Sequence, residues 1–204
     1  MLFDIIRFVL LLVASVFVIL KIRKSKINRK KLASFSIIAL CFVLIALTEV
    51  FPVENIFIDF RSPEKVFYYT DTGEINDILY GKESCIIIYS DRNTTCSHCI
   101  IPKTENGYKI PGYFSVKRIS HKFDRNGNFD VYNVSGTDDY YVIGTIISNE
   151  NDRAIVDSRG DPVKNIAVRM GNTQTKTVIA YSYVESFTDD YYLIINGTKT
   201  AVVG

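Results

Sequence analysis

The residues best suited to chemistry are two cysteines spaced three positions apart, in the motif Cys96-Ser-His-Cys99, with Cys85 on the apolar segment before it. Such a pair can be a redox centre when its first Cys starts a helix, because the helix dipole lowers the thiol pKa. The three thiols with His98 or His121 could instead supply the four ligands of a zinc site. Both chemistries need a local structure that the neighbouring residues must provide.

The residues after the motif do not favour either chemistry. They read Ile-Ile-Pro-Lys-Thr-Glu-Asn-Gly, which predicts a strand and a turn, and no second C-x-x-C follows. If segments 84–90 and 97–102 form a hairpin, Cys85 can lie opposite Cys99, and outside the cytoplasm that pair can be oxidised. Otherwise the thiols are free, small and half-buried.

A second candidate site has the alternating oxygen ligands of a calcium loop. Its members are Asp124, Asn126, Asn128 and Asp130. The segment lacks the Gly at the sixth place and the distal Glu, and Asn126-Gly127 is equally well explained as a hairpin turn.

The remaining motifs do not indicate an enzyme, and we expect neither a cofactor nor a metal. His98 and His121 are the only histidines and fall in no triad pattern. The acidic pairs at 138–139 and 189–190 are typical of solvated turns, and Arg159-Gly-Asp161 is an adhesion tripeptide or an ordinary turn. Clustered tyrosines at 140–141, 181, 183 and 191–192 belong partly to the core, and the others could form an aromatic binding surface.

Alternating apolar and polar residues, punctuated by turn residues, predict strands over most of the chain after residue 73. The predicted strands are 74–80, 84–90, 97–102, 108–110, 115–123, 128–134, 140–148, 154–157, 164–170, 176–186, 191–195 and 199–203. Short connections such as Asn196-Gly197 favour antiparallel neighbours. We therefore expect an antiparallel meander that forms a sandwich or a small barrel.

One short helix precedes these strands. Ser62 and Pro63 are suited to its N-cap and first position, and the residues from Asp71 to Gly73 should end it. One sequence, Thr-Asp-Asp-Tyr-Tyr, occurs at 137–141 and again at 188–192, each time before an apolar strand. This echo indicates either a duplicated three-strand unit or two similar turns.

The N-terminal quarter predicts a membrane hairpin. Two apolar runs, 2–20 and 32–51, are each long enough to span a hydrocarbon core of roughly 30 Å as a helix. Between them lies a cluster of basic residues: Lys21, Arg23, Lys24, Lys26, Arg29, Lys30 and Lys31. By the positive-inside rule this loop is cytoplasmic, so both chain ends lie outside. A cleaved signal peptide is disfavoured, because no small-x-small site precedes Lys21.

Charge is distributed unevenly between the two parts. Residues 1–50 carry 8 − 2 = +6 and the remainder 16 − 20 = −4, so the larger part should repel nucleic acid. We expect a transmembrane hairpin (1–51), a juxtamembrane connector (52–61) and a mainly-β extracytoplasmic domain (62–204) at the cell membrane. The predicted function is binding, sensing or an accessory role, with the lipid bilayer and an envelope protein or glycan as partners. The alternative is a thiol-redox or metal-binding protein that uses Cys96, His98 and Cys99.

Overall fold

The computed structural model describes residues 52–91, 96–124, 127–148, 154–169 and 176–203, and single helical positions at 13, 15, 16, 20, 37 and 40. Within this part of the chain, no helix is long and apolar enough to cross a membrane. The two predicted membrane helices and the basic residues 21–31 fall almost entirely outside the described residues. From residue 52 onward the protein is mainly β, with one short α-helix, as the sequence predicts.

Twelve strands follow a 3₁₀ turn, η1 (Val53–Ile56), and a helix, α3 (Pro63–Thr70). The strands are β1 (Glu74–Tyr80), β2 (Ser84–Ser90), β3 (Cys96–Thr104), β4 (Gly107–Tyr108), β5 (Val116–Asp124), β6 (Gly127–Val134), β7 (Asp139–Ser148), β8 (Ile155–Asp157), β9 (Lys164–Arg169), β10 (Lys176–Glu185), β11 (Tyr192–Ile195) and β12 (Thr198–Ala201). Each predicted strand is present, with both ends within two residues of the expected ones.

Helix α3 begins and ends where the sequence predicts. Ser62 is its N-cap residue, although its side chain makes no capping hydrogen bond, and Pro63 occupies the first turn. Val66 and Phe67 form its buried face. The helix is therefore held chiefly by packing, as expected for a helix of only two turns.

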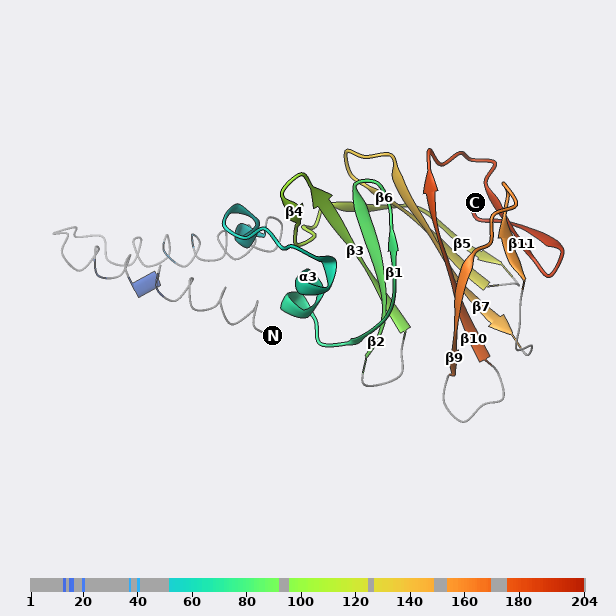
Figure 1. Ribbon diagram of the computed structural model, residues 1–204, viewed down its shortest axis with the longest axis horizontal. Coiled ribbons are helices and arrows are strands. Elements are labelled where there is room, and N and C mark those ends of the chain that lie inside the picture. Colours follow the sequence, from blue (N-terminus) through green and yellow to red (C-terminus); the bar gives the residue numbers. More distant parts are fainter. Residues whose placement is uncertain are drawn as a thin grey trace.

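The strands form three antiparallel sheets stacked as layers (Figure 1). The first has the order β1-β2-β3-β4, the second β5-β6-β7-β10-β9, and the third β12-β11-β8. No pairing joins the two edges of any of these sheets, so the architecture is a layered sandwich and not a barrel.

Three apolar clusters separate the layers. One lies between α3 and the first sheet, the next between the first and second sheets, and the last between the second and third sheets. Strand β2 contributes to two of them: Cys85 and Ile87 face α3, whereas Ile86 and Ile88 face the second sheet. Because successive side chains of a strand point to opposite faces, a strand buried on both faces is apolar throughout.

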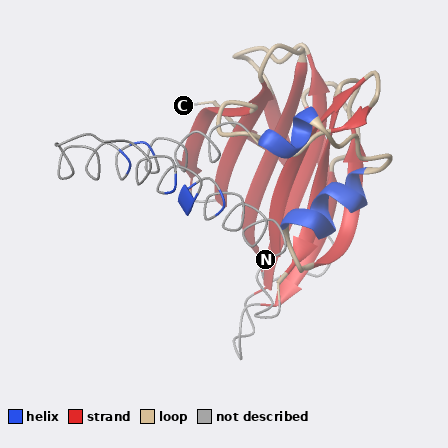
Figure 2. Ribbon diagram, turned by 90° about the vertical axis from the view of Figure 1, so that its left-hand side faces the viewer, coloured by secondary structure: helices blue, strands red, loops and turns tan. Residues whose placement is uncertain are grey.

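The segment predicted as a connector is folded onto the domain. Viewed from the helix side, η1 and α3 lie in front of the strands (Figure 2). Phe60 is buried in the core under α3 and pairs through its backbone with Tyr108. The side chain of Asn55 donates to the carbonyl of Ile110 and accepts from its amide, both at 2.8 Å. Residues 52–60 are thus structurally part of the β domain.

The two Thr-Asp-Asp-Tyr-Tyr segments do not belong to a repeated unit. The first leads into β7, which continues the meander from β5 and β6. The second leads into β11, which leaves the second sheet and pairs with β8 and β12. The hypothesis of a duplicated three-strand unit is therefore wrong, and the echo reflects two similar turns. The β11–β12 turn is the expected one, with positive φ at both Asn196 and Gly197.

Candidate functional site

The C-x-x-C motif lies inside strand β3 and not at a helix start. Side chains three positions apart on a strand point to opposite faces. Accordingly, Cys99 packs in the cluster under α3, whereas Cys96 packs in the cluster between the first and second sheets. The motif therefore cannot form a local disulfide or offer both sulfurs to one metal ion in this arrangement.

Cys85 does not lie opposite Cys99, so this expectation is wrong. The register pairs Cys85 with Ile101 and Cys99 with Ile87, which places the two cysteines diagonally on one face. Diagonal neighbours are roughly 7–8 Å apart, too far for a disulfide without backbone movement. Cys85, Cys96 and Cys99 are free thiols. Burial raises the pKa of Cys85 and of Cys99 to about 12, so neither is an activated nucleophile.

Of the predicted calcium ligands, Asn126 lies outside the described residues, and the side-chain oxygen of Asn128 is buried without a hydrogen-bond partner among those described. Asp130 accepts from His121 at 2.8 Å and from Arg118 at 3.4 Å across the β5–β6 pair. The ring of His98 packs against that of Tyr132 in a tilted arrangement, and burial lowers the pKa of His98 although the charge of Asp130 opposes this. Among the residues that the structure describes, no group of three or more His, Cys, Asp or Glu could hold a metal ion.

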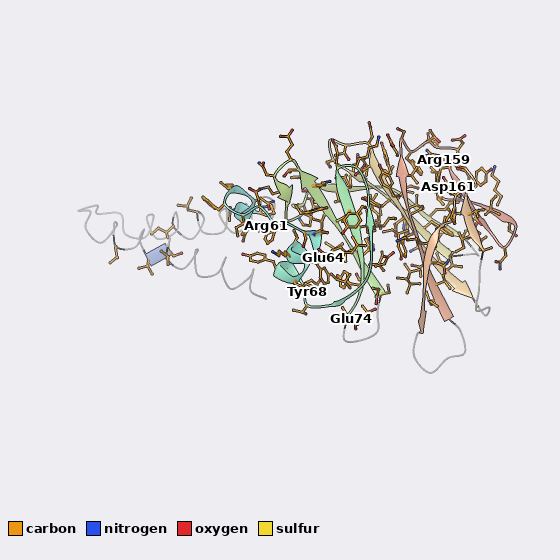
Figure 3. All side chains as sticks on the ribbon, viewed as in Figure 1. Arg61, Glu64, Tyr68, Glu74, Arg159 and Asp161 are labelled. Atoms are coloured by element: carbon orange, nitrogen blue, oxygen red, sulfur yellow. The ribbon has the colours of Figure 1, made fainter. Side chains whose placement is uncertain are left out.

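The Arg-Gly-Asp tripeptide is part of a tight turn built around Asp157. The buried carboxylate of Asp157 accepts from the amides of Arg159 and Asp161, both at 2.9 Å. The guanidinium of Arg159 donates to the carbonyl of Glu185 at 3.0 Å. Figure 3 shows Arg159 and Asp161 side by side, at the far end of the domain from Arg61 and Glu64. The ordinary-turn interpretation accounts for this tripeptide.

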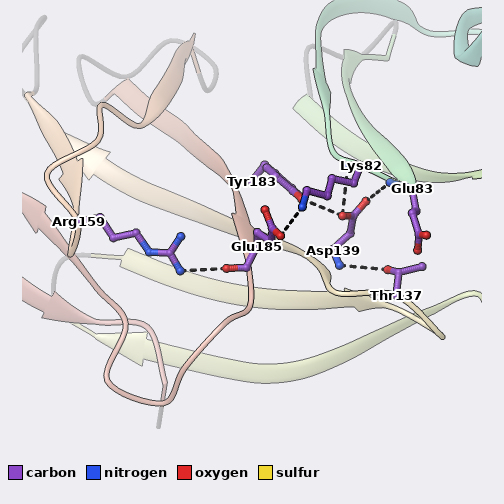
Figure 4. A network of polar contacts seen from close by, with 7 residues as sticks. All are labelled: Lys82, Glu83, Thr137, Asp139, Arg159, Tyr183 and Glu185. Carbon is purple, nitrogen blue, oxygen red and sulfur yellow. Dashed lines mark hydrogen bonds and ion pairs between the residues drawn. The ribbon is translucent and has the colours of Figure 1, made fainter.

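A polar network around Asp139 joins the first two sheets (Figure 4). Asp139 begins β7 and is only 1% exposed, so the expectation that this acidic pair is solvated holds for Asp138 but is wrong for Asp139. Its Oδ2 accepts from the amide of Glu83 at 2.8 Å and the hydroxyl of Ser84 at 2.5 Å. Its Oδ1 accepts from the hydroxyl of Tyr183 at 2.9 Å.

This network is suited to holding structure and not to catalysis. Ser84 is fully buried, and its hydroxyl also contacts the hydroxyl of Tyr141 at 2.9 Å. Burial, together with the hydrogen bond to Asp139, raises the pKa of Tyr183 to about 12, so its phenol stays protonated as a donor. Gly81 is required beside it, because an added Cβ would come within 2.5 Å of Asp139 Oδ2. We name Asp139 with these partners the sheet latch.

A second polar contact between the same sheets surrounds Asp77 on β1. It accepts from Lys164 at 2.8 Å and from the hydroxyl of Tyr181 at 2.6 Å. Burial alone would raise the pKa of Asp77, but the hydrogen bonds from Lys164 and Tyr181 outweigh it and hold the pKa below its usual value. Sequence patterns did not single out Asp77, because its partners are far away in the chain.

The clustered tyrosines are buried or half-buried. Tyr141, Tyr181 and Tyr191 are buried, and the other three members of the cluster are half-buried. Five of the six pack in the cores on the two sides of the second sheet, whereas the ring of Tyr192 lies under the ammonium of Lys199.

Exposed apolar side chains gather instead where the described domain begins. Ile56 and Phe57 are 75% and 84% exposed, and Tyr113 and Phe114 are 75% and 64% exposed. Ile56 and Phe114 line one open cavity of about 530 Å³, together with Pro52, Val53, Asn55, Gly112, Ser115 and Ser135. We name Ile56, Phe57, Tyr113 and Phe114 the connector patch. It is the best candidate for a functional surface, and sequence patterns did not reveal it.

No protein-family model, curated protein or solved structure matches this chain.

Proposed function

We propose that the chain is a cell-membrane protein in which two helices, residues 2–20 and 32–51, hold a β domain outside the cytoplasm. The observation that carries this proposal is the segment 21–31, in which seven of eleven residues are Lys or Arg and none is acidic. Short loops rich in Lys and Arg stay in the cytoplasm during insertion. Both chain ends, and with them the domain, then lie on the outer side.

The role proposed for the domain is non-catalytic: binding or sensing a partner, such as an envelope protein or a glycan, or acting as an accessory subunit. It is supported by the environment of the reactive groups. Ser84, Asp139 and Cys85 are buried, and each of the two carboxylates that join the sheets is already bonded to several donors. A substrate would find Ser84, Asp139 and Cys85 inaccessible.

The alternative, a thiol-redox or metal-binding protein centred on Cys96 and Cys99, has less support. The two thiols lie on opposite faces of β3, and burial raises the pKa of both. Redox catalysis depends on a lowered thiol pKa.

A reporter enzyme that is active only outside the cytoplasm tests the topology. Fused after Gly204 it should be active, and fused after Ser25 it should be silent. Replacing the seven basic residues of 21–31 with Gln should reduce the activity of the first fusion. Replacing the exposed Lys65, Lys103 and Lys117 of the domain should leave it unchanged. An active fusion after Ser25 with a silent one after Gly204 would overturn the proposal.

A further inference from the structure

The connector patch presents large apolar side chains from two segments that are distant in sequence. Its members protrude from η1 and from the loop before β5, and the rings of Tyr113 and Phe114 are in edge contact at 5.1 Å. Loop tips that face water are usually polar, and apolar side chains gathered on a surface mark an interaction site. The patch therefore needs a partner that accepts apolar and aromatic side chains.

The two segments are held together firmly, so the patch has a defined shape. Asn55 is bonded in both directions to the backbone of Ile110, at 2.8 Å each. The ammonium of Lys109 donates to the carbonyl of Asn55 at 2.7 Å and forms an ion pair with Asp59. Asn55, which makes the hydrogen bonds with Ile110 and Lys109, is the residue directly before Ile56.

The patch carries no charge of its own. Segment 110–115 reads Ile-Pro-Gly-Tyr-Phe-Ser, and Glu54, the single acid in segment 52–58, is buried. A partner recognised by ion pairs is therefore disfavoured. Tyr settles at the boundary between headgroups and acyl chains, where its hydroxyl stays wet and its ring dry, and Phe belongs to the apolar face that interfacial segments bury.

The position of the patch in the chain favours lipid as its partner. Pro52 lines the cavity beside the patch and directly follows the apolar run 32–51. An extended residue spans at most about 3.6 Å, so Phe57 lies within roughly 20 Å of residue 51. If that run ends at the membrane surface, Phe57 lies within roughly 20 Å of that surface.

We infer that the connector patch inserts into the interfacial layer of the lipid bilayer and fixes the orientation of the domain on the membrane. This inference rests on the proposed membrane anchor. The lipid is the occupant, and η1 with the loop 110–115 forms the contact. The third sheet, at the opposite end of the stack, then points away from the bilayer (Figure 1).

Tryptophan fluorescence tests this on the full chain, which contains no Trp of its own. Phe57→Trp and Phe114→Trp are compared with Phe123→Trp, a matched control because Phe123 is 81% exposed. Phe123 lies near the far end of β5, where the neighbouring Lys122 donates to the carbonyl of Val203 at 2.9 Å. Each variant is reconstituted into phosphatidylcholine vesicles with and without a lipid that carries a nitroxide on its headgroup. Flotation and resistance to alkaline carbonate report the anchor separately.

The expected result is that Phe57→Trp and Phe114→Trp lose fluorescence to the nitroxide and emit at shorter wavelength than Phe123→Trp. The inference would be overturned if the protein is bound to vesicles but the three Trp variants are quenched equally, or none is quenched. That outcome would leave the proposed membrane anchor intact. A blue-shifted Trp that the nitroxide does not quench would place a protein surface on the patch, such as a second copy, and would also overturn it. Protein that is extracted by carbonate would refute the proposed anchor itself.

Discussion

At the residue scale, the thiols and carboxylates owe their properties to burial and partners and not to their sequence neighbours. Cys96 and Cys99 form a recognisable motif, yet the strand separates them. Asp77 belongs to no motif, and Asp139 belongs to an acidic pair that is typical of solvated turns, yet each accepts hydrogen bonds from the facing sheet or turn. Two predictions follow from these individual groups.

The first concerns thiol reactivity. In a Cys41→Ser background, alkylation should modify Cys85 and Cys99 only after unfolding, because burial raises the pKa of both thiols to about 12. Mass spectrometry after timed labelling measures this. Reductant and chelator should both leave the denaturant midpoint unchanged. Destabilisation by reductant would indicate a disulfide, and destabilisation by chelator a bound metal.

The second concerns pH. Because the folded pKa of Asp77 lies below its ordinary value of 3.8, the contribution of this carboxylate to stability is complete above pH 3.8 and is lost as the pH falls below 3.8 through the lower folded pKa. The parent should therefore be more stable than Asp77→Asn near neutral pH, and the difference should shrink below pH 3.8. Denaturant melts across this range measure it.

Tyr181→Phe is the matched variant for the pH experiment, since it removes one donor to Asp77 and keeps the carboxylate. Near neutral pH, Tyr181→Phe should be less stable than the parent by a smaller amount than Asp77→Asn, and this difference should also shrink at low pH. If the difference in stability between Asp77→Asn and the parent does not change with pH, the lowered pKa of Asp77 would be contradicted.

At the element scale, the sheet latch ties the β1–β2 turn to the start of β7 and to β10. The turn supplies the amide of Glu83 and the hydroxyl of Ser84, β7 supplies Asp139, and β10 supplies Tyr183. Such a contact fixes how the first sheet lies against the second, because every donor is directed at one buried carboxylate.

Asp139→Asn should break this latch. The amide keeps one acceptor oxygen but turns an NH₂ group toward donors, so we expect a loss of roughly 2–4 kcal/mol in the free energy of unfolding. Denaturant melts monitored by circular dichroism measure the change. The control is Lys82→Ala in the same turn, whose side chain makes only an exposed ion pair with Glu185 and should matter little. Equal stability of Asp139→Asn and the parent would show that the latch is dispensable.

At the scale of the whole molecule, shared strands couple the layers. Strand β2 packs against α3 with one face and against the second sheet with the other. The second sheet in turn packs against the third. No layer can separate without exposing a core that belongs to its neighbour.

We therefore expect residues 52–204, expressed without the N-terminal segment, to be soluble and to unfold in one cooperative step. Their far-UV spectrum should be dominated by strand, and hydrogen exchange should be slowest at the amides of β2, because exchange from a doubly buried strand requires global opening. Two separate transitions, or fast exchange in β2, would contradict the coupling of the layers.

The strands and the short helix could be predicted from the sequence because their signals are local. Alternation with period two marked the strands, and Ser62, Pro63 and Gly73 marked the ends of α3. The turn at Asn196 and Gly197 requires positive φ at both residues, which few other residue types tolerate. The charge of segment 21–31 is likewise a property of the sequence alone, and it is the basis of the proposed topology.

Only the tertiary structure decided which strands pair, which faces meet and which polar groups are enclosed. β11 leaves the second sheet although its leading sequence matches that of β7. Asp139, the first residue of β7, is buried against Glu83 and Ser84, while Asp138 in the preceding bend is exposed. The connector patch arises where η1 meets the loop before β5, two segments joined by the Asn55–Ile110 contact across 55 positions of the chain. Contacts over such distances leave no periodic signal in a sequence, so the sequence pattern does not predict that these residues meet.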